Sequence, residues 1–228
     1  MTELQNITYS MNSREFIVML LLKDVKNIYG ISVDTAGISD KCIIETLYGM
    51  AKKNMLNTDN GEFIPDREYD VIFGIIKNAG KYITIYPMNT SRAVCFCYVG
   101  EKTVVIKKDA FNTELFHIDL IENSCFVRYF DNLDYLPPVI SGDGIADETA
   151  YEEYISKPPD ADVLMKKPDC KFIIVCEDKN NTYKDIISVN SHNPEWYMDR
   201  YINGIKVRQK YVRSGLEEYM NEMLVNGR

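Results

Sequence analysis

The spacing of apolar residues changes at Lys81. Before this point they recur at intervals of three and four, whereas Ile83 and Ile85 alternate with Tyr82, Thr84 and Tyr86 after it. Residues three or four apart share one face of a helix, and alternate residues share one face of a strand. The sequence therefore predicts an α+β fold, in which N-terminal helices are followed by a sheet.

Three helices are predicted before Lys81. Ser13 can cap a helix that stops at Gly30, and Ser39 can cap a second helix that ends near Leu56. Pro65-Asp66 opens a third helix, which Gly80 closes. Each carries an apolar stripe, so we expect all three to contribute to the core.

Two groups of strands follow, and short turns connect them. Gly100 and Asn203-Gly204 mark tight hairpins, and parallel strands would need much longer connections. We therefore predict a mainly antiparallel sheet in two pseudo-symmetric halves, with a last helix, capped by Ser214 and Glu217, packed on it. The expected strands are Lys81–Tyr86, Arg92–Val99, Thr103–Lys108, Leu115–Ile121, Cys125–Phe130, Lys171–Cys176, Asp185–Val189, Glu195–Tyr201 and Ile205–Tyr211.

An acidic segment separates the two groups of strands. Between Asp131 and Asp169 there are ten acidic residues and three lysines, a net charge of −7 out of −8 for the chain, together with five prolines. We expect a protease-sensitive connector with one short helix around Asp147–Ser156, although an acidic arm for a basic partner is the alternative. The chain is predicted to be a single α+β domain, 1–228, made of a helical cap 1–80, a first sheet half 81–130, the insert 131–169, and a second sheet half with the C-terminal helix 170–228.

Charge and hydropathy restrict the classes of partner and the location. A net charge of −8 and a pI near 4.9 make nucleic acid an unlikely main ligand, because phosphate binding needs a concentrated basic surface. The longest apolar run, Phe16–Leu22, is far shorter than the about 20 residues of a membrane span. The polar start with Glu3 does not resemble a signal peptide, so we expect a cytoplasmic location.

The reactive residues form no recognisable catalytic or metal motif. The six cysteines are scattered among apolar residues and are predicted to be free, mostly buried thiols, and no spacing suggests zinc. His117 is expected to be a partly exposed strand residue on the same face as Asp119. We predict a non-enzyme without cofactors or metals, and the enzymatic alternative would need Cys95 or Cys97 to meet His117 or His192.

Five stretches resemble the EspG-type cytosolic chaperones of bacterial type VII (ESX) secretion systems. They are Phe16–Leu21 in the opening helix, Leu47–Ala51 in the next, Pro65–Tyr69, the strand Tyr82–Tyr86 and the hairpin at Gly100. The resemblance implies a central antiparallel sheet of two pseudo-symmetric halves and a role in holding a helical secretion substrate before export. The acidic insert and the high Tyr, Asn and Lys content depart from the family pattern.

The sequence therefore favours a protein-binding module that holds a helical partner. The predicted contact site is a polar turn between two apolar strands, which we expect to project from the sheet without the fold depending on its side chains. A transcription regulator with a winged helix is the alternative, with Lys41, Lys52, Lys53, Arg67, Lys77 and Lys81 near DNA. The candidate partner-binding residues are Asp178, Lys179, Asn180, Asn181 and Thr182.

Overall fold

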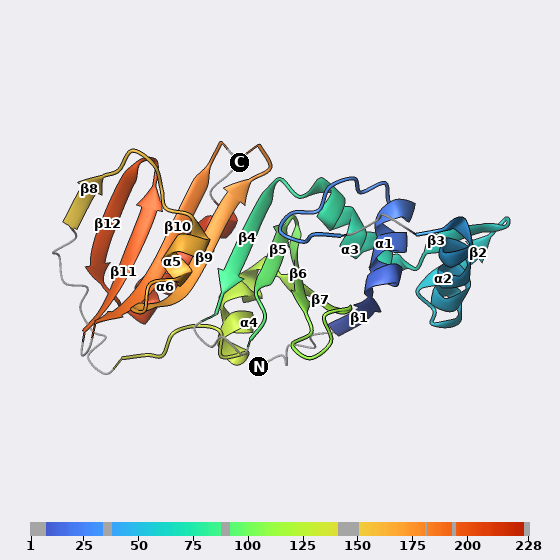
Figure 1. The fold of residues 1–228 in the computed structure, drawn as a ribbon, viewed down its shortest axis with the longest axis horizontal. Helices are drawn as coiled ribbons and strands as arrows, with labels where there is room; N and C mark the ends of the chain where they lie inside the picture. The colour runs from blue at the N-terminus through green and yellow to red at the C-terminus, as the bar shows by residue number, and fades with distance from the viewer. Residues whose placement is uncertain are drawn as a thin grey trace.

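In the part of the chain that the structure describes, the centre of the protein is a ten-stranded antiparallel sheet with the order β1-β7-β6-β5-β4-β9-β10-β11-β12-β8 (Figure 1). The computed structural model describes residues 8–33, 38–87, 92–140, 151–180, 182–192 and 195–225. A separate hairpin is formed by β2 and β3. The strands are β1 (Thr8–Asn12), β2 (Leu56–Asp59), β3 (Glu62–Pro65), β4 (Lys81–Tyr86), β5 (Cys95–Val99), β6 (Lys102–Lys108), β7 (Leu115–Glu122), β8 (Tyr151–Tyr154), β9 (Cys170–Asp178), β10 (Lys184–His192), β11 (Glu195–Ile202) and β12 (Ile205–Lys210).

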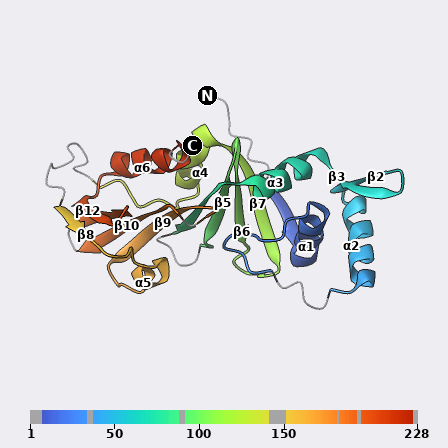
Figure 2. The same cartoon turned by 90° about the horizontal axis from the view of Figure 1, so that it is seen from above.

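Helices cover both faces of this sheet. Figure 2 shows α4 and α6 on one face and α5 on the other, and the packing of α1 and α3 against β5, β6 and β7 places these two helices on the same face as α5. The helices are α1 (Ser13–Leu22), α2 (Asp40–Lys52), α3 (Arg67–Asn78), α4 (Phe126–Asn132), α5 (Ala161–Met165) and α6 (Arg213–Val225), and a 3-10 turn, η1 (Asn123–Cys125), precedes α4.

The two halves of the sheet repeat one plan around the central pair β4 and β9. Each half contains an edge strand, a helix, a four-stranded meander and a closing helix: β1, α3, β4 to β7 and α4 in the first, and β8, α5, β9 to β12 and α6 in the second. The first half carries α1, α2, β2 and β3 between its edge strand and α3, whereas only residues 155–160 join β8 to α5. The predicted α+β fold with two antiparallel halves is therefore confirmed, and residues 13–65 break the symmetry.

The core lies on both faces of the sheet. On the α4 and α6 face, Phe130, Met220 and Leu216 pack on buried strand residues such as Cys97 and Ile174. On the opposite face, a cluster under α1 and α3 fills the first half, and a smaller cluster under α5 fills the second. A sheet covered on both faces explains the nearly continuous apolar runs in its central strands.

The predicted starts of the second and third helices are confirmed. The Ser39 side chain caps α2 and the Asp66 side chain caps α3. The first helix is capped instead by Asn12, which forms a capping box with Glu15. The last helix begins at Arg213, one residue before the predicted cap Ser214.

Three helices end at a left-handed residue that is not glycine. Asp24, Asn54 and Asp134 follow α1, α2 and α4 with positive φ angles of 51°, 58° and 52°. At each end, two backbone N–H groups return to the last-turn carbonyls in the Schellman pattern, as in Val25 N to Leu20 O at 2.9 Å. Because Asp and Asn tolerate the left-handed region, α1 stops at Leu22 and not at Gly30.

The strand predicted at Cys125–Phe130 is wrong. These residues lie in η1 and α4, whose buried rings Phe126, Tyr129 and Phe130 recur at i, i+3 and i+4. That spacing is helical, and it places all three rings on the sheet. The strand β1 and the β2–β3 hairpin were not predicted, so residues 8–80 are not purely helical.

The acidic insert contains ordered elements in its described residues. β8 pairs with β12, and α5 buries Leu164 against β9. The prediction of a short helix around Asp147–Ser156 is wrong for residues 151–156, of which Tyr151–Tyr154 form the strand β8, and residues 141–150 lie outside the described part. These contacts contradict the expectation that the described residues 151–169 form only a loose connector.

Candidate protein-binding surface

Residues 23–33, here called the strap, leave α1 and cross the sheet face that carries α1 and α3. The Tyr29 ring stacks on Tyr82 of β4, with ring centroids 4.5 Å apart and planes inclined by 5°. The Tyr98 hydroxyl donates to the Tyr29 carbonyl at 2.5 Å. Gly30 has φ +71° and lies so close to Phe96 that a Cβ would approach the ring to 2.2 Å, so only glycine fits here.

A polar contact fixes the strap to the second half of the sheet. The Tyr29 hydroxyl donates to the Glu177 carboxylate of β9, and Glu177 also pairs with Lys184 of β10 at 2.8 Å. Burial and the neighbouring Glu177 carboxylate raise the pKa of Tyr29, so its hydroxyl stays a neutral donor. The strap therefore joins β4, β5 and β9.

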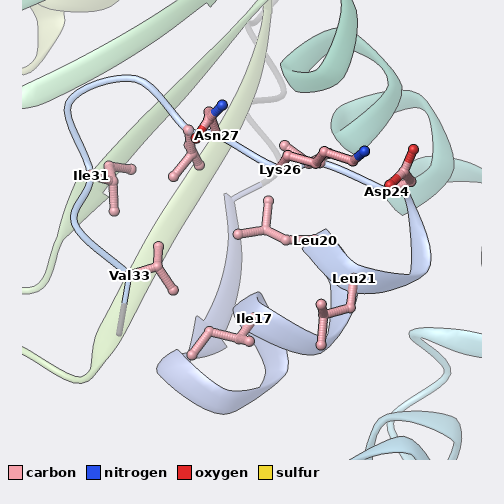
Figure 3. Close-up of a pocket in the computed structure, with 10 residues that line it drawn as sticks. Ile17, Leu20, Leu21, Asp24, Lys26, Asn27, Ile31 and Val33 are labelled. Atoms are coloured by element: carbon pink, nitrogen blue, oxygen red, sulfur yellow. The ribbon is translucent and has the colours of Figure 1, made fainter. Parts of the chain in front are cut away.

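A hollow lined by both apolar and polar side chains lies on one side of the strap (Figure 3). Its volume is about 480 Å³. Ile17, Leu20 and Leu21 of α1 line one wall, and Ile31 and Val33 of the strap line the other. Leu21 is 54% exposed, so the hollow opens to the surface with an apolar edge.

A groove lies on the other side of the strap. It has a volume of about 470 Å³, and the strap, the end of α3 and Tyr82 form its walls. Lys26, Lys77 and Lys179 contribute three cations, and among them Lys77 pairs with Asp24 at 3.8 Å. Because Asp24 and Asp178 also line the groove, it combines an aromatic wall with a rim of mixed charge in which lysines outnumber aspartates by one.

The predicted turn after β9 borders this groove. Asp178 and Lys179 both line it, Asn180 is exposed, and Asn181 lies outside the described residues. The Asp178 carboxylate accepts hydrogen bonds from Thr182 N at 2.7 Å, Thr182 Oγ1 at 2.6 Å and Tyr183 N at 2.8 Å. These hydrogen bonds lower the pKa of Asp178, with that from the Thr182 hydroxyl first.

The expectation that the fold does not depend on these side chains is therefore wrong for Asp178 and Thr182. Their hydrogen bonds close the turn, and the Lys179 N–H donates to the Gly80 carbonyl at 2.9 Å. The exposed side chains of Lys179 and Asn180 are the ones that can face a partner.

Sequence reasoning missed the strap, which forms a wall of both the hollow and the groove. Apolar residues Val25 and Ile28 continued the helical spacing of α1, so the segment was predicted to be helix. The interruption by Lys23-Asp24 and Lys26-Asn27 is the signal that could have placed it outside the helix, because Asp and Asn favour helix ends and turns.

The cysteine and histidine arrangement that an enzyme would need is not formed. Cys95 and Cys97 are buried, and burial raises the pKa of Cys95 to about 11 and that of Cys97 well above its usual range. Lys107 lies between Cys95 and His117 in the strand register, and His192 lies on β10. The two buried thiols are thus poor nucleophiles without a histidine partner.

His117 instead joins two other polar residues in a hydrogen-bonded chain. Its Nδ1 lies 3.1 Å from Ser10 Oγ, and its Nε2 lies 2.8 Å from Asp109 Oδ2. The second Asp109 oxygen accepts from the N–H groups of Phe111 and Asn112 at 2.9 Å. Neither the hollow nor the groove beside the strap is lined by Ser10, so we assign this hydrogen-bonded chain to joining β1, β7 and the turn after β6.

The lysines of the DNA-binding alternative do not share a basic face. Lys81 is buried, and its Nζ donates to the Met223 carbonyl of α6 at 2.7 Å, on the face opposite α1 and α3. Lys53 pairs with Glu15 at 2.6 Å, and Lys41 approaches Glu45 within 3.9 Å. These contacts give no support to a winged-helix role.

Among the described residues, histidine, cysteine and acidic side chains nowhere form a group of three that could hold a metal ion. Within the same residues, no helix has the length and apolar character needed to cross a membrane.

The comparisons with known proteins give a likeness of fold. No family model matches the chain, and no curated protein matches it by sequence. Among solved structures, the chain is similar to the Mycobacterium tuberculosis type VII secretion system chaperone EspG5, solved in complex with a PE25–PPE41 dimer. The TM-score is 0.57 and the identity 7%, over 96% of this chain and 96% of that chain. At this identity, the likeness shows that the two chains share a fold.

Proposed function

We propose that this chain is a non-enzymatic chaperone that binds a helical protein partner, of the kind exported by a type VII secretion system. The observation that carries the proposal is the likeness of fold to EspG5, which extends over 96% of both chains and so includes both sheet halves. EspG5 is a chaperone that was solved with a bound protein dimer. The same proposal places our protein in the bacterial cytoplasm, where a substrate is held before export.

The strap surface supports this function. A helix inserts side chains at intervals of one turn, and the hollow beside Leu21 and the groove beside Lys179 offer two separate openings on either side of one segment. Apolar side chains would bury the anchors of the partner, and the exposed Lys179 at the edge of the groove would favour an acidic residue beside them. We propose Lys179 and Asn180 as contacts at the edge of the groove.

The continuous sheet supports the proposal that residues 1–228 act as one domain. β4 and β9 pair along six residue positions, from Lys81 with Asp178 to Tyr86 with Ile173. The Met223 carbonyl of helix α6, in the second half, also accepts a hydrogen bond from the Lys81 ammonium of the first half. A partner bound at the strap would therefore contact both halves at their junction.

The experiment is a pull-down from the native host with matched surface variants. Leu21→Ser changes the hollow, and Val163→Ser changes an apolar residue on α5 that is equally exposed, at 54%. We expect the wild type and Val163→Ser to recover one helical protein and Leu21→Ser to lose most of it, with all three equally stable to heat. Recovery of no protein by the folded wild type would contradict the function, and equal recovery by Leu21→Ser would contradict the site.

A further inference from the structure

We infer that the outer face of α2 is a second docking surface, which binds an amphipathic helix of the protein partner in an antiparallel orientation. The inference rests on the proposed function and extends it to a surface away from the strap. The outer face consists of Ile44 and Tyr48 between Asp40 and Lys52.

The position of α2 in the fold is the first reason. It belongs to residues 13–65, the part of the first sheet half that has no equivalent between β8 and α5. Figure 1 shows α2 with β2 and β3 at one end of the molecule, beyond α1. Met50 is its only fully buried residue, so the helix contributes little to the core.

The apolar surface of α2 is wider than the part that the fold covers. Ile43, Leu47 and Ala51 are partly buried against the core under α1. Ile44 and Tyr48, one helical turn apart, are 52% and 60% exposed. Because i and i+4 side chains are neighbours on a helix, they form one apolar strip.

The hairpin beside α2 holds this strip in place. The Tyr48 ring packs edge-on against Phe63 of β3, with centroids 5.4 Å apart. At the C-terminal end of the helix, the cap residue Lys53 pairs with the Glu15 carboxylate of α1 at 2.6 Å. The strip is therefore presented by a helix that is held at two points, so binding costs little ordering of the chain.

The charges along α2 select the kind of occupant and its direction. Asp40 is exposed at the first residue and Lys52 at the last, whereas Lys41 and Glu45 approach each other within 3.9 Å. A helix with acidic residues in its first turn and lysines in its last turn matches both ends only when it runs antiparallel to α2. Antiparallel packing also places the opposite ends of the two helix dipoles side by side.

The test uses two synthetic helical peptides of about five turns with leucines at i and i+4. One has glutamates in the first turn and lysines in the last, and its twin has these charges reversed. Labelled peptides are titrated with the full chain and followed by fluorescence anisotropy, while hydrogen exchange reports protection of the α2 amides. We expect the first peptide to bind with protection of α2, and Ile44→Ser to weaken binding about tenfold, whereas Val163→Ser, on α5, leaves it unchanged.

The variant Lys52→Glu tests the direction without touching the apolar strip. It should weaken the first peptide and strengthen its charge-reversed twin by several fold. Absence of binding by either peptide, or equal binding to wild type and Ile44→Ser, would overturn the inference. The pull-down separates this failure from that of the function, because a partner retained by both wild type and Ile44→Ser leaves the proposed function intact and removes α2 from it.

Discussion

Tyr29 and Tyr82 lie face to face, with ring centroids 4.5 Å apart and planes inclined by only 5°. Tyr29 belongs to the strap and Tyr82 to the central strand β4, so this stack holds the wall of both surface openings against the sheet. The Tyr29 hydroxyl donates a hydrogen bond to the Glu177 carboxylate on β9. The shape of the candidate surface thus depends on one side chain that sequence analysis placed in a helix.

Removing the Tyr29 ring should loosen the strap without unfolding the sheet. We expect Tyr29→Ala to lower the free energy of unfolding by about 2–4 kcal/mol, because both the stack and buried apolar area are lost. Tyr29→Phe keeps the stack and should cost only about 1 kcal/mol, the value of one hydrogen bond. Urea unfolding measures both changes, and hydrogen exchange should show faster exchange of residues 24–33 in Tyr29→Ala. Equal effects of the two variants would show that the stack contributes nothing.

Asp24→Gly should stabilise the protein. Asp24 has φ 51° at the end of α1, where glycine has no steric cost. We expect a gain of about 0.5–1 kcal/mol in the free energy of unfolding, and a loss for Asp24→Ala. The contact with Lys77 at 3.8 Å is too exposed to reverse this order. A melting temperature of Asp24→Gly below that of the wild type would show that the side-chain contacts of Asp24 outweigh its backbone strain.

The contribution of Asp109 to the free energy of unfolding should disappear at acid pH. The hydrogen bond from His117, followed by those from Phe111 and Asn112, lowers its pKa from 3.8 to about 2. A carboxyl whose pKa is lower in the folded state stabilises the protein above its unfolded pKa, and this contribution is lost as the pH falls through about 2. Asp109→Asn should therefore be less stable than wild type at pH 5, and the difference should shrink towards pH 2. The exposed Asp59→Asn is the control, and an unchanged difference at both pH values would contradict the assignment.

The six thiols should react in two groups. Cys95, Cys97 and Cys176 are buried, and burial raises the pKa of Cys176 to about 12, whereas Cys42, Cys125 and Cys170 are partly exposed. Iodoacetamide should modify members of the second group in the folded protein and the first group only after denaturation. Mass spectrometry of tryptic peptides reads out each site. Early modification of Cys97 in the native protein would show that the core opens far more readily than its packing implies.

The architecture could be predicted from the sequence because periodicity and turn chemistry are local properties. Lys81 marks the entry into the sheet, and Asn203-Gly204, with φ angles of 51° and 77°, forms the tight hairpin that its dipeptide predicts. Short connections enforced antiparallel pairing, and that pairing gave the two similar halves.

The positions of the strap and of the edge strands could not be predicted from the sequence in the same way. Their positions follow from long-range pairing, such as β1 with β7 and β8 with β12, which local spacing does not encode. The end of α1 was missed because Asp24 closes it where glycine was expected. The turn at Asp178 was found from its polarity, but only the structure shows that Asp178 and Thr182 bond to each other while Lys179 faces the groove.

The most direct test of the partner-holding role is site-specific photo-crosslinking in the native host. A photoreactive amino acid replaces Leu21 at the apolar edge of the hollow or, as the control, Val163 on α5, which has the same exposed fraction. Our account predicts that the probe at position 21 captures one helical protein and that the probe at position 163 captures none. No adduct at position 21 in folded, abundant protein, or the same adducts at both positions, would contradict it.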